Sequence, residues 1–142
     1  MRRINLIAVV VSWVVDIAGS NVLSLVYGLG AMASGQATAA TFADQAAMLA
    51  RPDIYWSLFA LGLAVSGAAG YLAARIAGHD QVLHGFLSSV GALGLGLVTI
   101  GTTLAVTPLP IVVFAFISAP LAGAAGGALD LWRVRRRAPV NP

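Results

Sequence analysis

The sequence predicts an all-helical membrane protein with four transmembrane helices in a compact bundle. Three observations predict this fold: the apolar composition, the scarcity of charge, and four long apolar segments. Of the 142 residues, 59% are hydrophobic and 9% are charged, and the mean hydropathy is +0.91. A soluble domain is about 45–50% apolar and about 25% charged, so this chain has too few polar side chains to cover a surface in water. The composition excludes a soluble enzyme, a disordered protein and a nucleic-acid binder.

Four segments are long enough to cross a membrane. A helix rises 1.5 Å per residue, so roughly 20 apolar residues span a hydrocarbon core of about 30 Å. In lipid, backbone polar groups must be satisfied within the segment, and the apolar runs do not alternate as barrel strands do. We therefore expect one transmembrane domain over residues 1–142. Its helical spans are residues 4–29, 54–77, 82–106 and 111–131.

Residues at the segment ends support these boundaries. Pro52 and Asp53 open the second span, where proline near the first helical position and an acid in the first turn are favourable. Gly78 is typical of a position just after a helix, and Asp80 is typical of a residue that caps the next helix. Pro110 is suited to the start of the fourth span.

Residues 34–52 form the one long loop, on the outer side. Thr38 or Thr41 could cap a short helix in this loop. Its apolar residues, which include Phe42 and Met48, could rest that helix on the membrane surface. The alternative is a solvated connector with helical character.

The arginines predict the orientation. All eight basic residues are arginine, and seven flank the spans on one side: Arg2, Arg3, Arg75, Arg133, Arg135, Arg136 and Arg137. Only Arg51 lies on the other side. Cytoplasmic loops carry the excess of basic residues, so both termini are expected in the cytoplasm. The absence of lysine suggests a GC-rich bacterial genome and hence a multi-pass protein of the inner membrane.

A secretory signal is the alternative interpretation of the first span. Residues 31–33 read Ala-Met-Ala, which is similar to a cleavage site. The apolar run before them is longer than the usual 7–15 residues of a signal and contains Asp16. These two features favour a retained first span.

Small residues predict where the helices pack. Membrane helices associate through close approach at small side chains and through polar contacts. The second and fourth spans carry such residues four positions apart: Gly62, Ser66 and Gly70, and Ala119, Gly123 and Gly127. Packing within the chain and contact with a second copy are both consistent with these stripes.

Asp16 is the residue that most needs an explanation. It lies about twelve residues into the first span, roughly 18 Å deep and near the membrane midplane. Ser12, Ser20 and Ser24 recur at four-residue spacing with it and form one polar stripe. Asp16 is either a proton or cation site of a transport cycle, or a neutral acid that hydrogen-bonds a neighbouring helix. In the second case the partner is a Ser, a Thr or a backbone carbonyl of a neighbouring helix, and Thr99, Thr102 and Thr103 of the third span are candidates.

The other polar residues predict no catalytic or metal site. His79, Asp80 and His84 lie close in sequence, but two histidines and one acid on a short turn are too few ligands to indicate a metal. The chain has no cysteine, which excludes disulfides and thiolate ligands. Asp130 is expected to pair with Arg133 one turn later. We expect neither enzymatic activity nor a cofactor.

Two resemblances bear on the fold. The stretch Gly70-Tyr71-Leu72-Ala73-Ala74-Arg75-Ile76-Ala77-Gly78, followed by His84-Gly85, resembles a pattern of uncharacterised small bacterial four-span membrane proteins, which implies the four-span architecture. Asp16-Ile17-Ala18-Gly19-Ser20 is similar to the first span of small multidrug resistance transporters, where an embedded Glu precedes two apolar residues, Gly and Thr. That resemblance implies a shared proton and substrate site at Asp16 in an antiparallel dimer. The Asp, the long loop 34–52 and the arginine bias depart from that family.

Three functions follow as expectations. The first is a non-enzymatic inner-membrane protein that acts by packing, as a homo-oligomer or as a subunit of a larger membrane complex. The second is a proton-coupled transporter of small molecules that uses Asp16. The third is a holin-like pore former, which the size and the number of spans allow.

Overall fold

A computed structural model describes residues 4–98 and 100–137, with the backbone alone at residues 45, 102 and 106. Every regular element in these ranges is a helix, as predicted. The helices are α1 (Leu6–Ala33), α2 (Ala39–Ala43), α3 (Gln45–Leu49), α4 (Pro52–Ala77), α5 (Gln81–Leu87), α6 (Val90–Val98), α7 (Ile100–Val106) and α8 (Leu109–Arg137). Four stretches are long and apolar enough to cross a membrane: α1, α4, α5 with α6, and α8.

The helix ends have local causes. The Asn5 side chain caps α1 by accepting a hydrogen bond from the backbone N–H of Ala8 at 3.1 Å. Pro52 occupies the first position of α4, and Gly78 ends this helix with a left-handed φ of 69°. Asp80 precedes α5 as expected, but it adopts a left-handed φ of 45° and its side chain makes no cap bond. A glycine followed by this strained turn reverses the chain between α4 and α5.

The third predicted span, residues 82–106, is described in three pieces. Ser88 and Ser89 separate α5 from α6, and residue 99 lies outside the described residues, between α6 and α7. The Ser88 hydroxyl donates to the Gly85 carbonyl at 2.6 Å, and the Ser89 hydroxyl donates to the Ala119 carbonyl of α8 at 3.1 Å. At this division the Ser89 backbone N–H bonds the Phe86 carbonyl, three residues back instead of the four of an α-helix.

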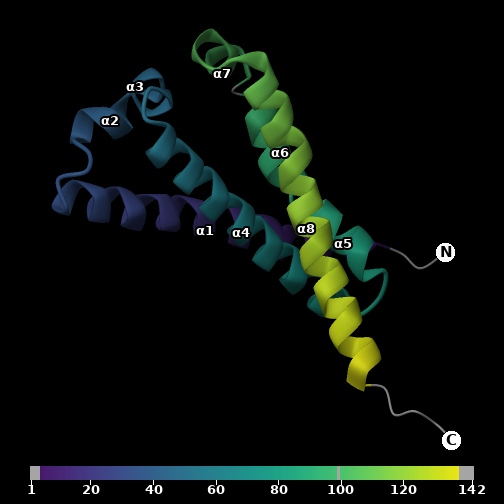
Figure 1. The fold of residues 1–142 in the computed structure, drawn as a ribbon. Coiled ribbons are helices and arrows are strands. Elements are labelled where there is room, and N and C mark those ends of the chain that lie inside the picture. The colour runs from purple at the N-terminus through teal and green to yellow at the C-terminus, as the bar shows by residue number, and fades with distance from the viewer. Residues whose placement is uncertain (1–3, 99, 138–142) are drawn as a thin grey trace, which may run out of the picture.

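The helices meet at one end of the molecule and diverge toward the other (Figure 1). The meeting point includes the first half of α1, the second halves of α4 and α8, and α5. We call it the arginine-rich end, because Arg75, Arg133, Arg135, Arg136 and Arg137 lie there. The opposite end carries Arg51, and there α1 points away from α6, α7 and α8 (Figure 1). The structure is therefore packed at one end and open at the other.

Small residues fill the packed end. A Cβ atom added at Gly70 would overlap the backbone of Gly123, and one added at Gly126 would overlap the Gly67 carbonyl. A Cβ atom at Gly127 would overlap the Gln81 carbonyl in the same way. The backbones of α4, α5 and α8 thus approach as closely as glycine permits, which is how membrane helices gain packing contacts without a hydrophobic driving force.

Near the Arg51 end, larger side chains fill part of the space between the helices. Ala31, Ala37 and Ile54 form a small buried cluster that Tyr27, Phe42, Met48 and Leu58 cover. Phe114 of α8 stacks on Phe59 of α4, with ring centroids 5.5 Å apart, and meets Trp56 edge-on at 6.2 Å. These aromatic rings bridge the widening gap between the two helices.

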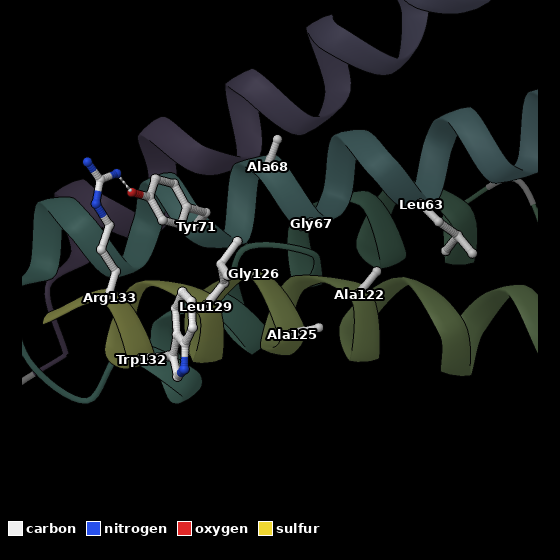
Figure 2. Close-up of a pocket in the computed structure, with 10 residues that line it drawn as sticks. All are labelled: Leu63, Gly67, Ala68, Tyr71, Ala122, Ala125, Gly126, Leu129, Trp132 and Arg133. Carbon is white, nitrogen blue, oxygen red and sulfur yellow. Dashed lines mark hydrogen bonds between the residues drawn. The ribbon is translucent and has the colours of Figure 1, made fainter. Parts of the chain in front are cut away.

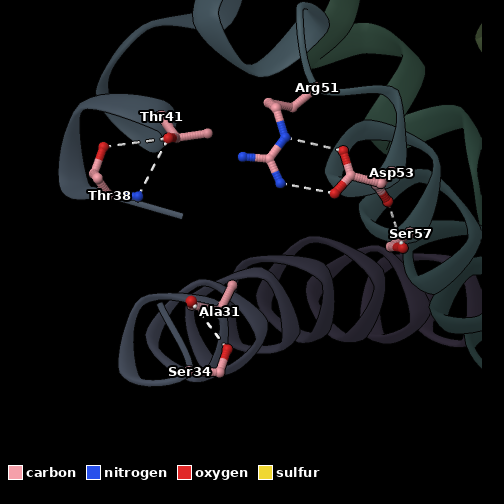
Figure 3. Close-up of polar contacts among 7 residues, drawn as sticks. All are labelled: Ala31, Ser34, Thr38, Thr41, Arg51, Asp53 and Ser57. Atoms are coloured by element: carbon pink, nitrogen blue, oxygen red, sulfur yellow. Dashed lines mark hydrogen bonds and ion pairs between the residues drawn. The ribbon is translucent and has the colours of Figure 1, made fainter. Parts of the chain in front are cut away.

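The loop between α1 and α4 contains the short helices α2 and α3. Thr38 precedes α2, and the Thr41 hydroxyl lies 3.3 Å from both the backbone nitrogen and the hydroxyl of Thr38 (Figure 3). Arg51 donates to both carboxylate oxygens of Asp53 at 3.1 and 2.8 Å, and this pair opens α4 (Figure 3). The hydrogen bond to Asp53 raises the pKa of the Arg51 guanidinium above its usual value. Helical structure in this loop matches the sequence expectation.

Candidate functional site

Asp16 is buried where α1 packs against α4. The residue is 2% exposed, and its Oδ1 atom accepts a hydrogen bond from the Ser66 hydroxyl at 2.9 Å. Among the described residues, nothing donates to the second carboxyl oxygen, Oδ2, which is buried as well. The carboxyl group of Asp16 is thus enclosed between two helices, and one of its oxygens is hydrogen-bonded.

The partner of Asp16 is a serine of a neighbouring helix, which is one of the groups expected, but it is not one of the named threonines. Ser66 lies in the second span, whereas the sequence pointed to Thr99, Thr102 and Thr103 of the third. Thr99 and the side chain of Thr102 lie outside the described residues. The physical reason is the geometry of the fold, because α1 packs mainly on α4 and meets α6 only briefly.

The predicted serine stripe does not form one buried site. Ser12 is fully buried, but its hydroxyl donates to the Val9 carbonyl of its own helix at 2.7 Å. Ser20 is half-buried, and Ser24 is exposed. Ser24 lines a separate apolar pocket of about 340 Å³ with Gly28 and Phe42. Asp16 and Ser12 are therefore the buried members of the stripe.

Two further polar contacts hold the first half of α1. The Trp13 indole donates to the Leu87 carbonyl at 2.8 Å. The Asn5 backbone N–H donates to Nε2 of His84 at 3.0 Å, and Nδ1 of that ring lies 3.1 Å from the Asp80 carbonyl. A neutral His84 with its proton on Nδ1 satisfies both contacts. His84 is fully buried and joins the start of α1 to the start of α5.

The two histidines do not gather a ligand set. The rings of His79 and His84 meet edge-on with centroids 5.1 Å apart. His79 pairs with Asp80 at 3.2 Å, while both nitrogens of His84 face protein atoms. Within the described ranges, no group of three or more His, Cys, Asp or Glu side chains is arranged to hold a metal ion.

The predicted packing residues lie mostly inside the chain. Ser66 and Gly70 are buried in α4, and Gly123 and Gly127 are buried in α8 against α5. The half-buried Ala119 accepts the Ser89 bond through its carbonyl. Gly62 differs from the others, because a Cβ atom added there has no neighbour within 4 Å. The same open space surrounds Gly30, Gly94 and Gly101.

Where α4 and α8 pack together, they form a groove that ends at the arginine-rich end (Figure 2). Its volume is about 820 Å³. The lining comprises Leu63, Gly67, Ala68 and Tyr71 of α4 with Ala122, Ala125, Gly126, Leu129, Trp132 and Arg133 of α8. Figure 2 shows Arg133 bonded to the Tyr71 hydroxyl at the end of an otherwise apolar surface.

A cationic pocket of about 260 Å³ adjoins the end of this groove. Arg75, Arg133 and Arg137 line it together with Asp130. Asp130 is 3% exposed and lies 4.0 Å from Nε of Arg75. The structure thus pairs Asp130 with Arg75 rather than with Arg133, because α4 brings Arg75 alongside α8. Sequence reasoning missed this cluster, although the aromatic residues and arginines at the span ends indicated it.

Comparison of the chain with protein-family models, curated protein sequences and solved structures finds no match.

Proposed function

We propose that this protein is a non-enzymatic inner-membrane subunit that acts by assembly, with itself or within a larger membrane complex. The observation that carries the proposal is the set of open glycines on helices that diverge. Gly30 of α1, Gly62 of α4, Gly94 of α6 and Gly101 of α7 have free space beyond their Cα atoms. Small residues on a membrane helix permit close approach of a second helix.

The closed setting of Asp16 supports assembly over transport. Its Oδ1 is bonded to Ser66, and the acid lies in the contact between α1 and α4 rather than in the groove beside α8. In this proposal Asp16 locks α1 to α4 and so sets the angle at which the two helices diverge. The compact bundle, with both termini cytoplasmic, forms when a partner helix fills the open half.

Chemical cross-linking in native membranes tests the proposal, because it detects both a second copy and a foreign subunit. We expect Gly62→Leu and Gly94→Leu to remove the cross-linked species while the chain still folds, since a Cβ atom added at either position has no neighbour within 4 Å. Ala128→Leu is the matched control, on an exposed position of α8 in the packed half. A wild-type protein that yields no cross-linked species would overturn the proposal, as would variants that cross-link like wild type.

A second candidate is proton-coupled transport, which the buried Oδ2 of Asp16 favours. A carboxyl oxygen that accepts no described hydrogen bond is an atom on which a transported proton could reside. The test is proton flux into liposomes that contain the purified protein, measured with an enclosed pH-sensitive dye. Asp16→Asn should abolish the flux, and Asp44→Asn, in the exposed loop, should preserve it. Wild-type liposomes that are no leakier than empty ones would reject this candidate.

A further inference from the structure

The groove between α4 and α8 and the cationic pocket beside it are two parts of one surface. Arg133 lines both cavities. The larger cavity is apolar along the helices, and the smaller one is cationic at their ends. An apolar channel that opens into a cluster of arginines has the same polarity pattern as a phospholipid, whose acyl chain joins an anionic headgroup.

The length of the groove matches one leaflet of a membrane. From Ala122 to Arg133 the groove follows α8 for eleven residue steps, or roughly 16 Å at 1.5 Å per residue. Half of a hydrocarbon core of about 30 Å is about 15 Å. A chain that enters at the arginines would therefore reach about the midplane beside Ala122 and Leu63.

The floor of the groove leaves room for an extended chain. Gly67 and Gly126 lie where α4 and α8 touch, and Ala122 and Ala125 project little beyond the helix. Leu129 and Trp132 form one wall (Figure 2). The lining between these residues is apolar, and the polar groups of the groove, on Tyr71, Trp132 and Arg133, lie toward its arginine-rich end.

The cationic pocket supplies the charge that a phosphate needs. Its three arginines and the single Asp130 give a formal charge of +2. Asp130 lies 4.0 Å from Arg75, and among the described residues no carboxylate lies within ion-pair distance of Arg133 or Arg137. Each guanidinium carries five N–H donors, and the bond from Arg133 to Tyr71 uses one of them.

Interfacial aromatic residues support the same placement. Trp132 lines the groove, and the guanidinium of Arg136 stacks over its ring at 3.9 Å. The Tyr71 hydroxyl accepts hydrogen bonds from Arg133 and, at 3.1 Å, from Arg75. Tryptophan and tyrosine are enriched at headgroup level, and basic pockets between membrane helices bind anionic headgroups.

We infer that this surface binds one anionic phospholipid, with its phosphate held by Arg75, Arg133 and Arg137 and one acyl chain in the α4–α8 groove. The inference is independent of the assembly proposal, because the open glycines lie outside this surface. The lipid fills the side of the α4–α8 contact that residues 4–98 and 100–137 leave uncovered.

Native mass spectrometry of the purified full chain tests the inference, with phosphatidylglycerol and phosphatidylcholine added separately as probes. We expect wild type to retain phosphatidylglycerol and to lose phosphatidylcholine. Each basic residue near an anionic headgroup contributes enough that Arg133→Gln or Arg137→Gln should lower retention about fivefold. Arg135→Gln is the matched control, with the same loss of charge in the same tail but outside both cavities.

Two further variants separate the parts of the surface. Ala125→Phe should fill the groove and reduce retention, whereas Ala128→Phe, one turn away and outside the groove, should not. Tyr71→Phe removes the bond to Arg133 but keeps the charge, so it should retain the lipid.

Three results would overturn the inference. One is equal retention of the two lipids. Another is an equal loss in Arg135→Gln and Arg137→Gln, which would show diffuse attraction only. The third is unchanged retention of phosphatidylglycerol by Ala125→Phe, which would show that contacts with the phosphate alone account for binding and that the groove holds no acyl chain.

Discussion

The Ser66 hydroxyl of α4 donates to the Asp16 carboxyl of α1 at 2.9 Å, at a point where both residues are buried. This bond joins two helices whose far halves separate, so it sits at the vertex of the angle between them. Loss of this hydrogen bond would leave both oxygens of a buried carboxyl group without a described donor, which lowers the stability of the contact between the two helices.

Ser66→Ala should lower the stability of the α1–α4 contact by about 1 kcal/mol, within the range of hydrogen bonds in membrane proteins. The measurement is thermal unfolding of the detergent-solubilised protein, followed by circular dichroism. Ser57→Ala is the control, because Ser57 bonds the Asp53 carbonyl at an exposed site. Equal melting of the two variants would contradict the assigned role of Ser66.

His84→Leu should destabilise the packed end by about 1–3 kcal/mol. The substitution leaves the Asn5 N–H and the Asp80 carbonyl without their ring partners, and buried polar groups without partners are costly. Hydrogen exchange at the start of α1 should quicken. His79→Leu should leave this exchange unchanged, since His79 faces Asp80 at a more open site. Slow exchange at Asn5 in His84→Leu would rule out the link.

Gly126→Ala should separate α4 from α8, because the added Cβ atom would overlap the Gly67 carbonyl. Overpacking of this kind costs about 1–3 kcal/mol. Gly94→Ala meets nothing within 4 Å and should stabilise its helix by about 0.5–1 kcal/mol. The free energies of unfolding of the two variants, measured side by side, should change in opposite directions relative to wild type. Changes in the same direction would contradict the described contact between α4 and α8.

The orientation can be measured with single cysteines, because the natural chain has none. Gln36→Cys, in the long loop, should react with a membrane-impermeant maleimide in intact cells. Arg135→Cys should react only after the membrane is permeabilised. Labelling of both in intact cells would place the arginine-rich end outside, contrary to the orientation argued from charge.

The sequence predicts the four apolar helices well because membrane insertion depends on length and hydropathy, which are local properties. Pro52 and Gly78 mark the limits of α4 for the same reason: proline and glycine act on their own backbone. Such features need no knowledge of neighbouring helices.

The partners of Asp16 and Asp130 needed the three-dimensional structure. Asp16 hydrogen-bonds Ser66 and Asp130 forms an ion pair with Arg75, and both partners lie in α4. The candidates named from the sequence were threonines of the third span for Asp16 and Arg133 on the next turn for Asp130. Which helices cross, and at what height, depends on the fit of many small residues. That fit has no signal in a single sequence beyond the presence of the glycines.

The bond between Asp16 and Ser66 also has a consequence for biosynthesis. The two residues are 50 positions apart, so α1 enters the membrane before its partner has been made. At about 5–20 residues per second, the ribosome needs roughly 3–10 s to add that length. During this interval α1 carries an acid that has no partner helix, which makes its insertion into the membrane less favourable by about 2.5–3.5 kcal/mol. The many valine and leucine residues of α1 offset this free energy, so that the helix can stay inserted until α4 has been made.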